Sequence, residues 1–144
     1  YHGRSWLPIL ADTGVEIHDA HFASHTFHEI QMYYPMRAVS DHEWKLIWNI
    51  AHPLPYPFAS DLWAASSWQS QYQRSLDAPY GNKTVKEYIY RPRFELYHIK
   101  EDPEETTNLA NDPDHARTLF KYQEKLKEMQ QKFRDPWITK WNYE

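Results

Sequence analysis

The stretch FELYHIKEDPEETTNLANDP, Phe94–Pro113, decides the fold of the second half of the chain. Its first part, residues 94–99, alternates apolar and polar side chains, which is the pattern of a strand with one buried face. Two Asp-Pro pairs follow, Asp102-Pro103 and Asp112-Pro113. Each pair offers a carboxylate that can cap a helical turn and a proline whose missing N–H costs nothing at the first helical position. We therefore predict a strand, a short turn at the first pair and a helix after the second.

The predicted helix carries an apolar stripe at spacings of three and four, which places these residues on one face. The stripe consists of Leu119, Tyr122, Leu126, Met129 and Phe133, and it stops before Asp135-Pro136. A helix that ends there would bury this stripe against the sheet.

Further strands are expected upstream. Residues 22–36 mix aromatic and β-branched residues with polar ones, which is typical of one or two strands. Residues 44–50 place Trp44, Leu46, Trp48 and Ile50 on one face by strict alternation. Residues 87–90 predict another short strand before Phe94.

A proline at every second position of residues 53–57 predicts a stiff connector, because each ring fixes φ and keeps the preceding residue extended. Ser60 can then cap a helix that ends before Pro79, with Leu62, Ala65, Trp68, Tyr72 and Leu76 at helical spacing. Together the elements predict an α+β fold. In it, a small antiparallel β-sheet of about four strands is packed by the long C-terminal α-helix, with one additional helix.

Composition excludes several classes of function. The 144 residues suffice for a real core, and the formal net charge of −4 has no basic stripe, so we expect no nucleic acid partner. No apolar run approaches the roughly 20 residues that cross a bilayer, so no membrane partner is expected. Absence of cysteine excludes disulfides, thiolate metal ligands and thiol catalysis. The many aromatic residues fall mostly at periodic positions, which favours a core over a sugar-stacking platform.

Imidazoles and a carboxylate lie close together in His25-Thr26-Phe27-His28-Glu29. On a strand His25 and His28 would face opposite sides and could not chelate one ion, whereas a helical turn would allow it. The functional interpretation is that these side chains line a polar pocket and bind an anionic or hydroxylated ligand. The structural interpretation is that they are surface residues at the end of a strand.

Arg37 follows two tyrosines, and Arg91 and Arg93 flank Pro92. A guanidinium beside aromatic rings can bind a carboxylate or sulfate with two hydrogen bonds, or it can pair with a nearby acid of the chain. The acids at 102, 104, 105 and 112 are explained by their positions at helix starts, so no metal site is predicted there.

Several segments together resemble the C-terminal region of a sulfatase of the alkaline-phosphatase-like superfamily. The resemblance covers nearly the whole chain. The segments Tyr34–Arg37 and Pro53–Pro55 are similar to the sulfamidase branch of that family. The segment that runs from the strand at Phe94 to the Asp-Pro pair is similar to sulfatases at large. The segments are Gly3–Leu10, His28–Val39, Trp44–Asn49, His52–Pro57, Phe94–Tyr97 and Asp102–Ala110.

The resemblance implies a hydrolase whose nucleophile is a formylglycine made from Cys or Ser in a Cys/Ser-x-Pro-x-Arg motif, assisted by calcium. Neither that motif nor the calcium ligands are found here. The resemblance therefore places the catalytic residues, the formylglycine and the calcium in a separate catalytic domain. It implies no catalytic residue, metal ligand or cofactor in this chain, which alone should be inactive.

Residues 1–19 would then be the end of the catalytic-domain segment or a linker, and residues 20–144 the sulfatase C-terminal domain. The partners implied are the N-terminal catalytic domain, which Trp6, Leu7 and Ile9 would face, and a sulfated glycan of the N-sulfoglucosamine or heparan type. A homodimer is compatible with this assignment. Relatives in animals are lysosomal, and those in bacteria are periplasmic or secreted.

The resemblance carries His25, His28, Glu29 and Arg37 over as the residues expected to reach the glycan. The alternative is a non-catalytic carbohydrate-binding or protein-interaction module with the same fold. A third hypothesis is a small self-sufficient hydrolase that uses His and Glu. Sulfate or sugar release by the purified chain would distinguish that third hypothesis from the other two.

Overall fold

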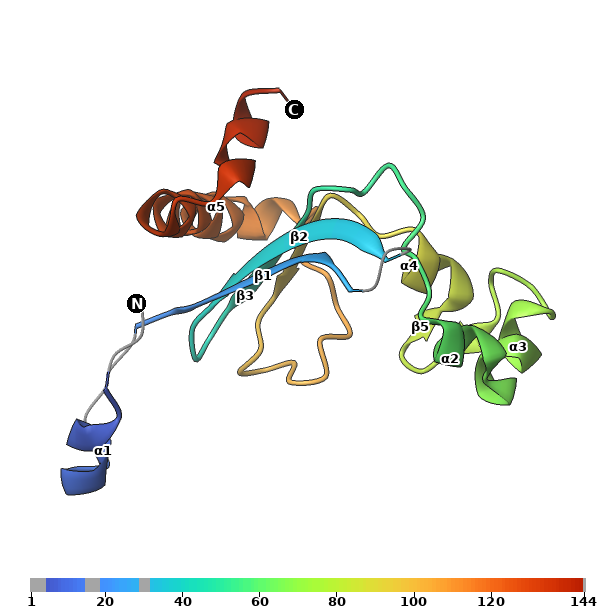
Figure 1. Ribbon diagram of the computed structural model, residues 1–144, viewed down its shortest axis with the longest axis horizontal. Helices are drawn as coiled ribbons and strands as arrows, with labels where there is room; N and C mark the ends of the chain where they lie inside the picture. Colours follow the sequence, from blue (N-terminus) through green and yellow to red (C-terminus); the bar gives the residue numbers. More distant parts are fainter. Residues whose placement is uncertain (1–4, 15–18, 29–31, 144) are drawn as a thin grey trace.

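The computed structural model describes residues 5–14, 19–28 and 32–143. Its centre is a four-stranded antiparallel sheet in the order β1-β2-β3-β6 (Figure 1). The strands are β1 (His21–Phe27), β2 (Tyr33–Ser40), β3 (Lys45–Asn49) and β6 (Phe94–Tyr97). The predicted α+β class and the antiparallel sheet are confirmed.

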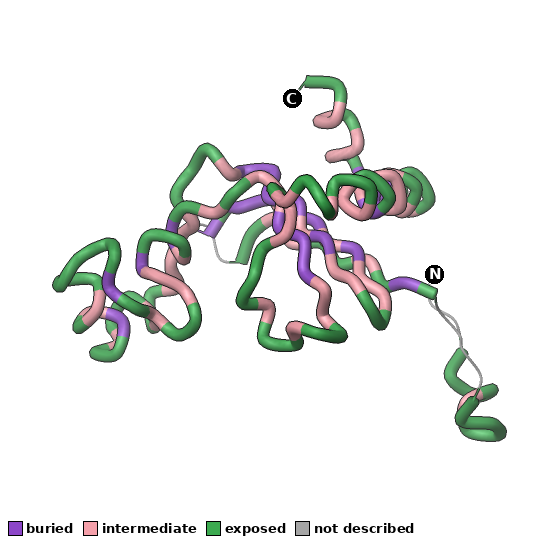
Figure 2. Tube along the Cα trace, turned by 180° about the vertical axis from the view of Figure 1, so that it is seen from behind, coloured by how far each residue is buried: buried purple, intermediate pink, exposed green. Residues whose placement is uncertain are grey.

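The helix α5 (Ala116–Phe133) covers one face of this sheet. Register aligns Val39, Leu46 and Leu96 across three neighbouring strands, so these side chains share the covered face. Tyr122 and Leu126 of α5 pack against them in one buried cluster. Figure 2 shows the buried segments gathered along the strands, while the outer side of the helix is exposed. The stripe predicted for this helix is therefore confirmed as its buried face.

Short 3₁₀ helices flank α5, η1 (Pro113–His115) before it and η2 (Pro136–Asn142) after it. Both begin at an Asp-Pro pair, and the Asp112 and Asp135 carboxylates accept hydrogen bonds from the backbone N–H groups of Asp114 and Trp137. The cap predicted at Asp112 is confirmed. At Asp135 the sequence predicted only the end of the long helix, and the structure shows a cap there as well. At Asp102 the carboxylate accepts from the N–H groups of Thr106 and Thr107, and the segment forms a turn, as predicted.

A second hydrophobic cluster lies at the end of the sheet that is far from α1 (Figure 1). It is built around the fully buried Trp68. Its elements are α2 (Ser60–Ala64), α3 (Ser66–Tyr72), the hairpin β4 (Pro79–Tyr80) and β5 (Lys83–Thr84), and α4 (Val85–Ile89). Phe58, Tyr80 and Tyr88 surround the Trp68 ring at centroid distances of 4.9–5.2 Å. Here the aromatic residues serve as core.

Three sequence-based predictions were wrong in this second cluster. Ser60 does not cap a helix, because it is the first residue of α2, and the N-cap position is Ala59 without a side-chain hydrogen bond. The single helix from residue 60 is two short helices, because Ala65 is extended (φ −67°, ψ 129°) and the following Ser66-Ser67 pair favours helix starts over helix interiors. The strand predicted at residues 87–90 is the helix α4. Thr84 and Glu87 form a reciprocal capping box that nucleates it.

The short helix α1 (Leu7–Ala11) contributes nothing to either cluster. Trp6 and Leu10 are 77% and 83% exposed, and Figure 1 shows this helix standing apart from the sheet. Such an exposed apolar segment is typical of a surface that contacts other protein. No helix in the described part of the chain has the length and apolar character needed to span a bilayer.

Candidate functional site

His25 and His28 lie at the end of β1, and Glu29 lies outside the described residues. His25 is half-buried and pairs with Met36, which pairs in turn with Asn49, so the three share the face of the sheet away from α5. Burial lowers the pKa of His25, and the charges of His28, Arg37 and Arg91 lower it further. The His25 imidazole is therefore held towards its neutral form near several cationic groups.

Arg37 lies on the other face of the sheet, the one that α5 covers, and pairs with Trp48 of β3. Only 4% of Arg37 is exposed. Its Nε and Nη2 donate to the two carboxylate oxygens of Asp135 at 2.6 and 3.0 Å. Its Nη1 donates to the backbone carbonyls of His25 and Met36 at 2.7 and 2.8 Å. Every nitrogen of this guanidinium thus has a partner within the chain.

The Asp135 carboxylate is held by a second layer of polar groups. Gln130 Nε2 donates to it at 2.9 Å, and Gln130 Oε1 accepts from the indole of Trp141 at 2.7 Å. Burial acts to raise the pKa of Asp135, but the hydrogen bonds from Arg37, Gln130 and the Trp137 N–H outweigh it, so the pKa is lowered. The carboxylate is consequently held in its ionised form.

These contacts give Arg37 a clear structural role. It fixes the backbone of β1 at His25 and joins the sheet to the segment after α5. A direct contact between Arg37 and a glycan stays a prediction, as do those of His25, His28 and Glu29.

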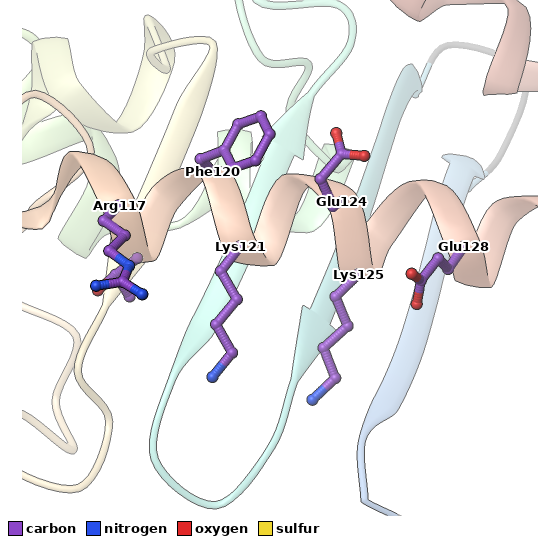
Figure 3. A pocket seen from close by; sticks show the side chains of 7 residues that line it. Arg117, Phe120, Lys121, Glu124, Lys125 and Glu128 are labelled. Carbon is purple, nitrogen blue, oxygen red and sulfur yellow. The ribbon is translucent and has the colours of Figure 1, made fainter.

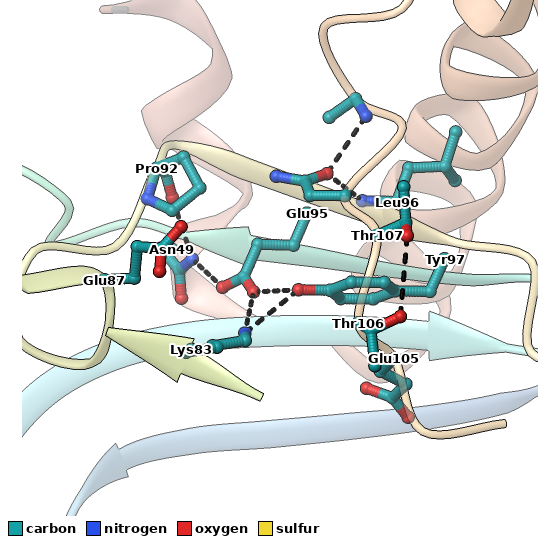
Figure 4. Close-up of polar contacts among 12 residues, drawn as sticks. Asn49, Lys83, Glu87, Pro92, Glu95, Leu96, Tyr97, Glu105, Thr106 and Thr107 are labelled. Atoms are coloured by element: carbon teal, nitrogen blue, oxygen red, sulfur yellow. Dashed lines mark hydrogen bonds and ion pairs between the residues drawn. The ribbon is translucent and has the colours of Figure 1, made fainter. Parts of the chain in front are cut away.

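A polar network that sequence analysis missed lies on the face of the sheet away from α5 (Figure 4). Glu95 is buried and accepts hydrogen bonds from Asn49 at 2.7 Å and from the Tyr97 hydroxyl at 2.5 Å. Lys83 Nζ, from the β4–β5 hairpin, lies 3.4 Å from Glu95 and 3.2 Å from Tyr97. Burial acts to raise the pKa of Glu95, but these hydrogen bonds and the Lys83 charge lower it overall.

A hollow of about 360 Å³ borders this network. It is lined by the buried Glu95 and Tyr97 and by exposed polar and aromatic groups. The lining residues are Asn82, Lys83, Glu87, Tyr90, Pro92, Glu95, Tyr97, Thr106, Thr107 and Asn108. Sequence alternation marked Glu95 only as a residue between two apolar neighbours of a strand, and nothing local indicated that it would be buried.

Another hollow runs along α5 (Figure 3). Its lining alternates basic and acidic side chains, among them Lys121, Glu124, Lys125 and Glu128, around the exposed ring of Phe120. Lys125 pairs with Asp41 at 3.1 Å, and Glu124 pairs with Lys127 at 2.6 Å, so two of these charges are already paired within the chain. None of the predicted glycan-binding residues lines this surface.

Among the residues that the structure describes, no group of three or more His, Cys, Asp or Glu side chains is arranged to hold a metal ion.

Comparison with known proteins gives one sequence relative and several structural ones. The chain is 36% identical over 138 residues to human N-sulphoglucosamine sulphohydrolase, an alignment that covers 94% of this chain and 27% of the human protein. The chain thus spans about a quarter of the length of this relative. No family model matches it.

The structural relatives are sulfatases. A 2-O GAG sulfatase superposes with a TM-score of 0.61 and 18% identity, covering 96% of this chain and 22% of that one. A second protein, solved in complex with its substrate D-glucosamine-2-N,6-O-disulfate, superposes with a TM-score of 0.56 and 16% identity, covering 93% and 20%. At such identities these structures establish the fold. The predicted resemblance is thus confirmed. In sequence the chain is similar to N-sulphoglucosamine sulphohydrolase, and in fold it is similar to the C-terminal region of sulfatases.

Proposed function

We propose that this chain forms the substrate-wall and scaffold domain at the C-terminal end of a sulfatase-type hydrolase that acts on sulfated glycans of the N-sulfoglucosamine or heparan type. The observation that carries the proposal is the 36% identity to N-sulphoglucosamine sulphohydrolase along 94% of the chain. The disulfated glucosamine named as substrate of one structural relative supports the same class of ligand.

In this proposal the catalytic residues belong to a domain outside this chain. The formylglycine nucleophile and the calcium belong to an N-terminal catalytic domain, and this chain alone is inactive. Residues 1–19 form the end of the catalytic-domain segment or a linker, and residues 20–144 form the C-terminal domain. Trp6, Leu7 and the half-buried Ile9 supply contacts to that catalytic domain, and the exposed Leu10 of the same helix extends this apolar surface.

His25, His28 and Glu29 are proposed to contact the glycan from the end of β1, with Arg37. The observed contacts of Arg37 support its part best as a positioning residue, since it holds the His25 carbonyl at 2.7 Å. A half-buried neutral imidazole such as that of His25 can accept a hydrogen bond from a sugar hydroxyl, and a ring N–H of the exposed His28 can donate one to a sulfate oxygen.

The proposed setting is the lysosome for an animal protein and the periplasm or the exterior for a bacterial one. A homodimer is compatible with the proposal.

The test compares the chain alone with the full-length protein that contains it. We expect the full-length protein to release sulfate from glucosamine N-sulfate, and the 144-residue chain to release no more than buffer. Turnover by the isolated chain would contradict the proposal. A full-length protein without sulfatase activity would favour the non-catalytic carbohydrate-binding or protein-interaction module.

A variant tests the site itself. In the full-length protein Glu29→Gln should lower kcat/KM for glucosamine N-sulfate with little change in melting temperature. Glu128→Gln, on the exposed side of α5, is the matched control and should change neither. A large loss of stability with unchanged kinetics would assign Glu29 a structural role instead.

A further inference from the structure

The hollow beside Glu95 has the size of a small ligand site. Its volume of about 360 Å³ lies at the lower end of the range of roughly 300–1,000 Å³ found for ligand pockets. It is bordered by three separate parts of the chain, namely the β4–β5 hairpin with α4, the strand β6, and the turn after Asp102. Such convergence of distant segments is typical of a built site.

The floor of the hollow is polar, and its side chains are hydrogen-bonded to one another. Glu95 is held by Asn49, Tyr97 and Lys83, as Figure 4 shows, and both Glu95 and Tyr97 are buried. An ionised carboxylate can accept about four hydrogen bonds, and Asn49, Tyr97 and Lys83 supply three of them to Glu95. The ammonium of Lys83 has three donors and gives two of them to Glu95 and Tyr97. The floor therefore retains one acceptor and one donor position.

The walls supply an aromatic face and further hydroxyl and amide groups. The ring of Tyr90 is 51% exposed, and Thr107 and Asn82 are exposed at the rim. The Thr106 hydroxyl is hydrogen-bonded to Asp102 at 3.0 Å, whereas the Thr107 hydroxyl has only a 3.5 Å contact with the Thr106 hydroxyl. An exposed ring beside paired donors and acceptors matches a sugar ring, which has an apolar face and a rim of hydroxyl groups.

The charged side chains that line the hollow determine whether it favours a neutral, a cationic or an anionic sugar. The lining carries two carboxylates, Glu87 and Glu95, against the single ammonium of Lys83. Hydrogen bonds from Thr84 lower the pKa of Glu87, and the pKa of Glu95 is lowered too, so both stay ionised at neutral pH. The net charge of the lining is therefore negative, which disfavours a sulfate or a uronate carboxylate.

We infer that this hollow is a subsite for an uncharged or amino pyranose ring, with Tyr90 as its stacking face and Glu95, Lys83 and Thr107 as its hydrogen-bonding groups. Its assignment to a glycan substrate rests on the proposed function. Both the hollow and His25 lie on the side of the sheet away from α5, so a glucosamine unit further along the same glycan could occupy the hollow.

Binding can be tested on the 144-residue chain without any catalytic activity. Isotope-labelled chain is titrated with methyl β-D-glucoside, with glucosamine and with glucose 6-sulfate, and the backbone amide shifts of Lys83, Thr106 and Thr107 are followed by NMR. We expect saturable shifts with the first two sugars, in the millimolar range typical of so small a ligand. Glucose 6-sulfate should bind about tenfold more weakly because of the negative lining.

Variants assign the binding to the named residues. Tyr90→Ala should abolish saturation, and Thr107→Val should weaken binding several-fold while leaving the Asp102 turn intact. Phe120→Ala removes another exposed ring, 62% accessible on α5, and should leave the titrations unchanged. Lys86→Gln removes an exposed cation in α4 next to the hollow and should also have no effect.

Unchanged binding by Tyr90→Ala, an equal loss in Phe120→Ala, absence of saturable shifts with all three sugars, or tighter binding of the sulfated sugar would each overturn the inference. Failure of the proposed function is seen separately, as absence of sulfate release by the full-length protein, and saturable binding in the hollow would still establish the subsite in that case.

Discussion

Arg37 of β2 and Asp135, which follows α5, form a buried pair of hydrogen bonds across 98 positions of sequence. The same guanidinium holds the carbonyl of His25 in β1. One side chain thus connects the sheet edge, the neighbouring strand and the end of the long helix. The part of β1 that carries the candidate glycan-binding residues is consequently positioned by α5.

Loss of this pair should be costly. Asp135→Asn keeps the size of the side chain but leaves the Arg37 charge buried and unpaired, which typically costs about 3–5 kcal/mol of unfolding free energy. Urea unfolding followed by tryptophan fluorescence measures it. Glu124→Gln, which removes the exposed pair with Lys127, is the control and should change stability by less than about 1 kcal/mol. A loss of similar size in the two variants would show that the buried pair has no special weight.

The same pair should make stability depend on acid. Because the pKa of Asp135 is lowered in the folded chain, its contribution is fully present above the ordinary value of about 4 and is lost as pH falls below it. The difference in unfolding free energy between the native chain and Asp135→Asn should be constant from pH 7 to pH 5 and should shrink towards pH 3. Other titrating groups, such as His25, cancel in this difference. A difference that stays constant down to pH 3 would contradict the prediction.

The fold could be predicted from sequence wherever local pattern and tertiary packing agree. Leu46 and Trp48 alternate in β3, and Tyr122 and Leu126 recur at helical spacing in α5, so each pattern states which face is buried. The prediction failed at α4. There, tyrosines and an isoleucine favoured a strand, although the Thr84-x-x-Glu87 spacing of a capping box was present in the sequence.

The site was less predictable, since its geometry depends on residues far apart in sequence. Arg37 could be identified as a residue that pairs with a carboxylate, but its partner lies 98 positions away. Burial of Glu95 is caused by Asn49 and by the hairpin that carries Lys83, 46 and 12 positions away. Local patterns do not contain such information.

The helix α4, which the sequence analysis predicted as a strand, can be tested through its capping box. Thr84→Ala removes the hydroxyl that accepts from the Glu87 N–H at 3.2 Å, and should destabilise the chain by about 1 kcal/mol. Amide exchange of residues 85–89 should accelerate at the same time. Thr84→Ser retains the hydroxyl and should behave like the native chain. If the alanine variant matched the serine variant, the start of α4 would depend on packing of Val85 and Ile89 alone.

Asn108 closes the outer edge of β6, and its removal should expose that edge. Its Oδ1 accepts from the Leu96 N–H at 2.9 Å and its Nδ2 donates to the Phe94 carbonyl at 3.1 Å, so the side chain imitates a neighbouring strand. An unpaired strand edge is a template for pairing with other chains. Asn108→Ala should therefore speed exchange of the Leu96 amide by about fivefold, as loss of one hydrogen bond of about 1 kcal/mol implies, and should increase self-association in light scattering. Asn108→Asp keeps the acceptor for Leu96 but loses the donor, so the Leu96 amide should stay protected in that variant. Equal exchange of the Leu96 amide in both variants would mean that the neighbouring bond from the Leu109 N–H to the Leu96 carbonyl protects the edge without help from Asn108.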